Sequence, residues 1–232
     1  MVESAQDRKP NHRHLLPWLL LFLLFTIGVV PIVEYFRDAR IFVHIGLTGV
    51  LLTAAGLTLH NRRQVVVAVS CAVAAVILSW MTLVVESPGL FLASTVFEAL
   101  FLFAMAVFIL ITVLRQHLAT IESIFGAIAA YLLIGFAFAL VYWGIAFANP
   151  EALKFPEAVM NYVVADEEAN LISEYSYFIY FSFVTMSTLG YGDVTPQTSI
   201  AQTLAWTQAV IGQFYIAVLV AWLVSEISND RK

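Results

Sequence analysis

Residues 180–196 read YFSFVTMSTLGYGDVTP, and this stretch decides what the chain can build. Gly190 and Gly192 alternate with larger residues directly after a short apolar and aromatic segment. Because glycine adopts positive φ angles readily, the pattern lets ordinary and left-handed residues alternate. Successive carbonyl groups then point to one side of the chain. Oxygen atoms that share one side of a backbone can together coordinate a cation.

The composition around this stretch predicts a membrane protein. The chain has 232 residues, of which 61% are hydrophobic and 12% are charged. The charged share is roughly half of the ~25% that is usual in soluble domains. A soluble fold of this size cannot bury so much apolar side chain, which argues against a soluble enzyme. The net charge of −5, without a basic stripe, also argues against a nucleic-acid partner.

Six apolar stretches are long enough to cross a bilayer, which takes about 20 residues in a helix. They are residues 15–33, 41–59, 65–85, 90–114, 121–147 and 200–224. Within the long break before the last stretch, residues 149–174 are polar and acidic, whereas 175–188 are apolar and too short to span. Such a segment enters and leaves a membrane on one side only where protein or water satisfies its backbone. The predicted fold is an all-α membrane protein with six transmembrane helices and a re-entrant helix and loop between the fifth and the sixth.

Lysine and arginine set the expected orientation, because cytoplasmic loops carry an excess of both. Placing the N-terminus in the cytoplasm puts three of these residues outside, namely Arg37, Arg40 and Lys154. It puts the other eight inside: Arg8, Lys9, Arg13, Arg62, Arg63, Arg115, Arg231 and Lys232. We therefore predict that both termini are cytoplasmic and that the number of crossings is even.

The segment TLGYGD at 188–193 resembles the selectivity filter of potassium channels. With GAIAAYLLIGFAFALVY at 126–142, it makes the second half of the chain similar to bacterial six-helix potassium channels that have one pore loop per chain. The resemblance implies a protein of the plasma (inner) membrane that conducts K⁺ passively, with K⁺ as the permeant ion and no cofactor or catalytic residue. One loop cannot surround an ion, so the pore needs four copies of the chain, embedded in membrane lipids.

The resemblance assigns a role to each residue of the loop. The expected filter consists of Thr188, Leu189, Gly190, Tyr191, Gly192 and Asp193. Its K⁺ ligands are the Thr188 hydroxyl and the backbone carbonyls of Thr188, Leu189, Gly190 and Tyr191.

Residues outside the loop are expected to support it. Tyr180, Phe181 and Val184 precede the filter, and Tyr180 is placed to hydrogen-bond its outer end. Gly212 in the last helix has two interpretations: a gating hinge, or a small residue that allows close helix packing.

The resemblance divides the chain into an N-terminal segment 1–14, a voltage-sensor-like four-helix bundle 15–117, a pore module 118–226 and a tail 227–232. The fourth helix carries Glu98 as its only ionisable residue, so it has no arginine ladder and we expect voltage to gate weakly or not at all. Glu98 is interpreted either as a proton or cation sensor or as a hydrogen-bonded carboxyl that faces another helix, with His44 as a candidate partner.

Two other functions fit the same pattern. One is a weakly selective cation channel of the same architecture, and the other is a membrane sensor or scaffold subunit whose pore module does not conduct. A secondary transporter fits less well, because transporters usually have duplicated halves with broken helices and this chain has a single loop.

Overall fold

The computed structural model describes residues 15–29, 39–57, 62–85, 87–115, 120–156 and 175–229. The predicted N-terminal segment 1–14, most of the acidic stretch and the last three residues of the predicted tail lie outside the described residues. The same holds for Arg37 and for the N- and C-terminal lysine and arginine residues on which the predicted orientation depends.

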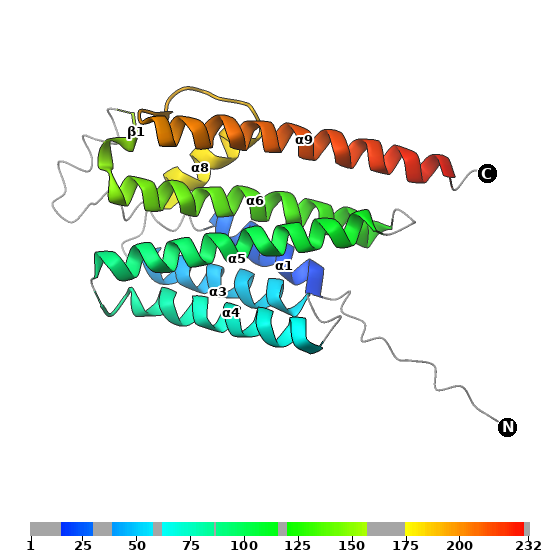
Figure 1. The fold of residues 1–232 in the computed structure, drawn as a ribbon, viewed down its shortest axis with the longest axis horizontal. Helices are drawn as coiled ribbons and strands as arrows, with labels where there is room; N and C mark the ends of the chain where they lie inside the picture. Colours follow the sequence, from blue (N-terminus) through cyan, green and yellow to red (C-terminus); the bar gives the residue numbers. More distant parts are fainter. Residues whose placement is uncertain are drawn as a thin grey trace.

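The structure is an assembly of helices, which confirms the predicted all-α class (Figure 1). The helices begin and end close to the predicted stretches. They are α1 (Leu15–Leu24), which continues as the π-helix η2 (Phe25–Val29), α3 (Ala39–Gly56), α4 (Arg62–Met81), α5 (Pro88–Leu114), α6 (Ile121–Ala148), α8 (Tyr175–Met186) and α9 (Ser199–Asn229).

Three of these helices are long and apolar enough to cross a membrane: α5, α6 and α9 over Ser199–Trp222. The sequence predicted six. The helices of the first three predicted stretches are apolar but shorter than a typical span. Residues 30–33 and 58–59 of those stretches lie outside the described residues, and α4 ends at Met81 in a hydrogen-bonded turn.

Helices α5 and α6 form an antiparallel pair because both begin at strong start signals and only a short link separates them. Pro88 stands in the first turn of α5, where its missing N–H is not needed. Thr120 caps α6, since its hydroxyl accepts from the Ser123 N–H at 3.2 Å and Ser123 Oγ accepts from the Thr120 N–H. The rings of Phe103 and Phe138 then meet edge to face at 5.1 Å across the pair.

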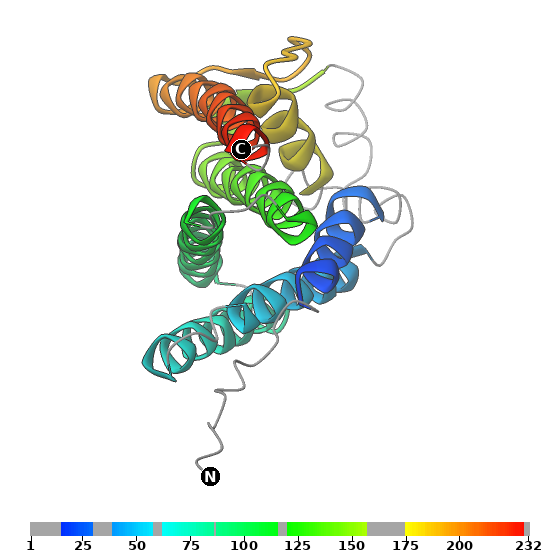
Figure 2. The same cartoon turned by 90° about the vertical axis from the view of Figure 1, so that its right-hand side faces the viewer.

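Helix α6 lies at the centre of the molecule. Apart from the short α8, which runs in the same direction as α9, successive helices run in alternating directions, so that the start of α1 and the end of α9 lie toward the same end (Figure 1). Contacts run from α1 to α3, α4, α5 and α6 in turn, and α6 also contacts α1, α8 and α9 (Figure 2). Every residue from 133 to 140 of α6 is buried. The first four helices therefore close on α6, which joins them to the region of the loop.

Candidate functional site

The loop begins where α8 ends, in a hydrogen-bonded turn typical of helix C-termini. The Leu189 N–H donates to the Val184 carbonyl at 3.0 Å, and the Thr188 N–H donates to the Thr185 carbonyl at 3.0 Å. This pair of bonds is the Schellman motif, whose closing residue adopts the left-handed conformation and is usually glycine. Here that residue is Thr188, with φ of 59°.

Left-handed and ordinary residues alternate through the loop. Positive φ angles occur at Thr188, at Gly190 (53°) and at Gly192 (77°). The sequence predicted this for the two glycines, but not for Thr188, because β-branched residues rarely adopt positive φ. Helices commonly end in a left-handed residue, and this tendency was the signal that could have revealed the positive φ of Thr188. All six residues from 188 to 193 are exposed in the single chain.

The outer end of the loop is fixed by the carboxylate of Asp193. The Tyr180 hydroxyl donates to Asp193 Oδ2 at 2.5 Å, and the Val194 N–H donates to Asp193 Oδ1 at 3.0 Å. The tyrosine hydrogen bond holds the pKa of Asp193 below its usual 3.8. The same bond and the negative charge of Asp193 raise the pKa of Tyr180 to about 12.

These shifts predict the pH range over which the bond stabilises the loop. Asp193 has a lowered pKa, so its contribution is present above pH 3.8 and is lost as the pH falls through the folded-state value. Tyr180 has a raised pKa, so its contribution is present below pH 10.0 and is lost as the pH rises through about 12. We expect ion selectivity to be constant between about pH 5 and pH 9, where both groups keep their protonation states.

A Tyr180→Phe variant tests this bond. Without the hydroxyl the bond is absent at every pH, so selectivity should be lower than in the wild type already at neutral pH. The pKa of Asp193 also returns toward its usual value, so the further loss on acidification should begin at a higher pH. Reversal potentials recorded during an acid titration measure the difference. Identical acid profiles for the two proteins would show that the bond does not stabilise the loop.

The three predicted support residues lie in different places. Tyr180 bonds to Asp193, and the Val184 carbonyl accepts from the N–H groups of both Leu189 and Gly190. Phe181 points away from the loop and packs edge to face on Tyr142 of α6, with ring centroids 4.7 Å apart. Tyr180 and Val184 thus touch the loop directly, whereas Phe181 holds α8 against α6.

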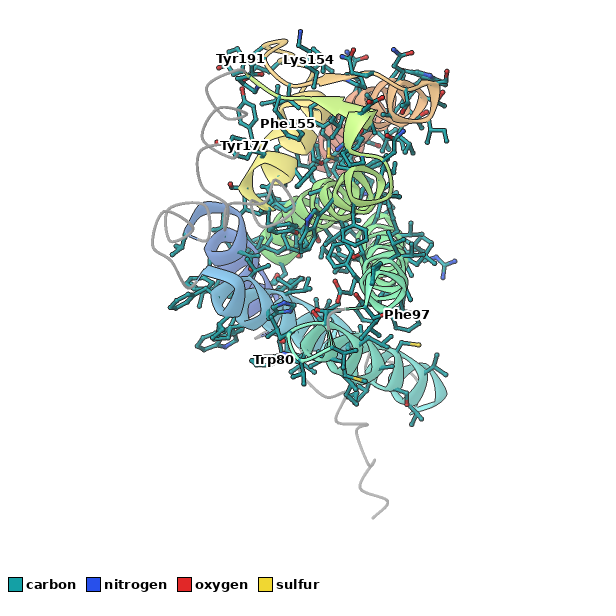
Figure 3. All side chains as sticks on the ribbon, turned by 90° about the vertical axis from the view of Figure 1, so that its left-hand side faces the viewer. Trp80, Phe97, Lys154, Phe155, Tyr177 and Tyr191 are labelled. Atoms are coloured by element: carbon teal, nitrogen blue, oxygen red, sulfur yellow. The ribbon has the colours of Figure 1, made fainter. Side chains whose placement is uncertain are left out.

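A short antiparallel strand pair holds the exit of the loop to the end of α6. Strand β1 (Leu153–Lys154) pairs with β2 (Thr195–Pro196), and the Gln197 N–H donates to the Ala152 carbonyl at 2.8 Å. Phe155, which follows β1, meets the Tyr177 ring at 6.0 Å, and Figure 3 shows Tyr191 and Lys154 at the same end of the molecule. The loop is therefore held by hydrogen bonds at its start, to the end of α8, and at its exit, through the strand pair.

Gly212 lies where α9 crosses the end of α8. It is buried, and a Cβ atom at this position would overlap the backbone carbonyl oxygen of Met186. The close approach matches the packing interpretation of this glycine. The hinge interpretation stays a prediction, since α9 is a continuous helix through Gly212.

Sequence reasoning missed a set of buried polar side chains behind the loop. Gln208 of α9 is hydrogen-bonded to Tyr142 of α6 and to Ser182 of α8. All three side chains are 0% exposed. A glutamine inside an otherwise apolar helix was the available signal, because a buried amide needs partners.

Glu98 lies away from the loop and is 3% exposed. Its side chain is hydrogen-bonded to Ser79, whose Oγ lies 2.8 Å from His44 Nδ1. One interpretation of Glu98, a hydrogen-bonded carboxyl that faces another helix, thus fits one of its oxygens, whereas Glu98 Oε1 is buried without a hydrogen-bond partner among the described residues. Ser79 of α4, which the sequence did not single out, stands between Glu98 and His44.

Comparison with known proteins assigns a class to the part of the chain that holds the loop. Residues 128–229 match the family model described as "Ion channel". The matched region includes most of α6, all of α8 and the loop, and α9. No curated protein and no solved structure matches the chain. The match indicates an ion-channel region at residues 128–229, and the long apolar helices indicate a membrane protein.

Proposed function

We propose that the chain is a subunit of a potassium-selective channel that lets K⁺ pass down its electrochemical gradient. The observation that carries the proposal is the alternation of positive φ angles at Thr188, Gly190 and Gly192 directly after α8. Such a backbone turns the carbonyl groups of residues 188–191 toward one side, where they replace the hydration shell of a cation. Asp193 closes this stretch at its outer end.

Helix α8 favours a cation at the inner end of the loop. The C-terminus of a helix carries a partial negative charge of about half an elementary charge. Helix α8 ends at Met186, two residues before Thr188, so this charge lies next to the first carbonyl of the loop. A cation that has lost part of its hydration is stabilised there.

A ring of carbonyl oxygens requires more than one chain, and the exposed surface supports a homotetramer. Leu189, Tyr191, Trp206 and Phe214 are between 55% and 67% exposed in the single chain, far more than large apolar side chains in a finished core. A cavity of about 800 Å³ also opens beside the loop. Its walls include Ile27, Tyr177, Tyr180, Phe183, Leu189 and Asp193. Neighbouring copies and lipid tails are the proposed occupants of these apolar surfaces.

The protein is expected to purify as a tetramer, because four loops complete each ring of oxygens. The mass of the detergent-solubilised particle, corrected for bound detergent, measures the number of chains. A stable monomer or dimer would contradict the proposed pore.

The proposed topology has six crossings in the plasma (inner) membrane, with both termini in the cytoplasm and the α8–loop hairpin re-entrant from the outer side. The alternating directions of the described helices α1, α3, α4, α5, α6 and α9 support it. The shorter helices α1, α3 and α4 are the proposed first three crossings.

Voltage is expected to change the open probability only shallowly. Moving one charge through 100 mV supplies about 2.3 kcal/mol, so steep gating needs several charges per subunit. Helix α5 carries none of the arginines that supply such charges, and its only ionisable side chain, Glu98, is buried beside Ser79. Single-channel recording across a wide voltage range gives the slope, and a slope that demands many elementary charges would contradict this prediction.

Two alternatives share the architecture: a weakly selective cation channel and a non-conducting sensor or scaffold subunit. Reconstitution in planar bilayers separates them from the proposal. Unitary current steps are expected from a channel, whereas a scaffold subunit produces none. The potassium–sodium preference of those steps then separates a selective from a weakly selective pore.

A further inference from the structure

The buried polar side chains behind the loop form one continuous set of hydrogen bonds. The Tyr142 hydroxyl donates to Gln208 Oε1 at 2.9 Å. Gln208 Nε2 donates to the Ser182 carbonyl at 3.0 Å and to Ser182 Oγ at 2.7 Å. The Ser182 hydroxyl donates in turn to the Gly135 carbonyl at 2.6 Å. Helices α6, α8 and α9 are thereby joined at one level.

The donors and acceptors available in this network fix the direction of each hydrogen bond. The Ser182 carbonyl can only accept, so the amide of Gln208 must turn its NH₂ group toward Ser182, and Gln208 Oε1 is left to accept from the Tyr142 hydroxyl. The two hydrogens of that NH₂ group are both used on Ser182. The serine hydroxyl then donates its own hydrogen to Gly135. Because Tyr142, Ser182 and Gln208 are all buried, the loss of one partner leaves an unsatisfied buried polar group, which is destabilising.

The network lies next to the start of the loop. Ser182 stands one helical turn before Met186, the last residue of α8. Gln208 stands one turn before Gly212, whose backbone abuts the Met186 carbonyl. Helix α9 therefore contacts the last turn of α8 twice, through the hydrogen bonds of Gln208 and through the close packing of Gly212.

From this geometry we infer that Gln208 is a positioning residue for ion selectivity, and this inference rests on the proposed function. The side-chain hydrogen bonds of Gln208 go to Tyr142 of α6 and Ser182 of α8 rather than to the loop. It holds the last turn of α8 against α6 and α9, and that turn fixes where Thr188 begins the loop. Carbonyl oxygens discriminate between cations through their spacing, their number and the strength of their dipole field. A shift of this turn moves the carbonyl oxygens of the loop and therefore changes the preference for K⁺.

The test compares two single variants, their double variant and a control variant of the tetramer in planar bilayers. Gln208→Leu keeps the approximate size of the side chain and removes all its hydrogen bonds, and Ser182→Ala removes the hydroxyl that Gln208 Nε2 contacts. Tyr215→Phe is the matched control. It removes another buried hydrogen bond of α9, from the Tyr215 hydroxyl to the Ala127 carbonyl, that involves α6 but not α8.

We expect Gln208→Leu and Ser182→Ala each to lower the K⁺/Na⁺ permeability ratio about tenfold, which corresponds to about 1.4 kcal/mol. The double variant should be no worse than the worse single variant, since both changes break the same network. Tyr215→Phe should lower the melting temperature of the tetramer and leave the permeability ratio unchanged. Where Gln208→Leu does not assemble, Ser182→Ala decides the outcome with the smaller structural change.

Two results would overturn the inference. One is a wild-type permeability ratio in Ser182→Ala and in any Gln208→Leu tetramer. The other is an equal fall in the ratio in Tyr215→Phe, which would show that the network stabilises the fold without positioning the loop. A wild-type protein without K⁺ preference is a different result, because it contradicts the proposed function itself.

Discussion

Replacing Gly190 with alanine is expected to abolish or strongly degrade potassium selectivity. Gly190 has φ of 53°, and a residue with Cβ costs roughly 1–2 kcal/mol in this conformation, repeated in each of four copies. A Cβ atom there meets no atom within 4 Å in the single chain, so the cost lies in the backbone rather than in a clash. Thr188 tolerates a similar φ because its turn is closed by helix-end hydrogen bonds, whereas the bond from the Gly190 N–H to Val184 is long, at 3.4 Å.

The control for this variant is Gly89→Ala in the first turn of α5. Gly89 has no positive φ, and its nearest neighbour to a new Cβ is Ser87 Oγ at 4.0 Å. The Gly89→Ala variant should leave both assembly and selectivity unchanged. Undiminished selectivity in Gly190→Ala, measured by the reversal potential, would contradict the role of the left-handed backbone.

The Gly212→Ala variant should lose tetramer stability. The new Cβ would overlap a backbone oxygen at Met186, which no side-chain rotation can relieve, so α9 or the end of α8 must shift. Overpacking of this kind typically costs about 1–3 kcal/mol per site, and the tetramer contains four such sites. The melting temperature and the yield of tetramer in detergent measure the loss, with Gly89→Ala again as the control.

The same variant separates the two interpretations of Gly212. A glycine that acts only as a hinge would be replaced by a good helix former, giving a stable tetramer with altered gating. A glycine required for packing gives an unstable tetramer instead. A Gly212→Ala tetramer that melts at the wild-type temperature would contradict the packing interpretation.

The sequence predicted those parts of the molecule that depend on local chemistry. Continuous apolar stretches with short polar breaks placed the helices within a few residues of where they lie, because lipid-compatible helices leave a strong compositional signal. Gly190 and Gly192 marked the positive φ angles, since few other residues adopt them readily. The resemblance to potassium-channel filters also predicted a hydrogen bond from Tyr180 to the outer end of the loop, and the structure gives Asp193 as its partner there.

The rest depends on contacts between distant parts of the chain. Thr188 adopts its left-handed conformation because α8 ends there in a Schellman motif, and no feature of threonine itself indicates this. Gln208, Ser182 and Tyr142 meet only because three helices cross at one level. The position of Ser79 between His44 and Glu98 likewise follows from how α3, α4 and α5 pack.

The most direct test is the reversal potential of the purified wild-type tetramer in a planar bilayer with potassium on one side and sodium on the other. The measurement tests conduction and selectivity together. A loop that coordinates dehydrated K⁺ through the carbonyls of residues 188–191 predicts unitary currents that reverse far from zero, on the side that marks K⁺ as the preferred ion. Unitary currents that reverse near zero, or a bilayer that stays silent, would contradict it.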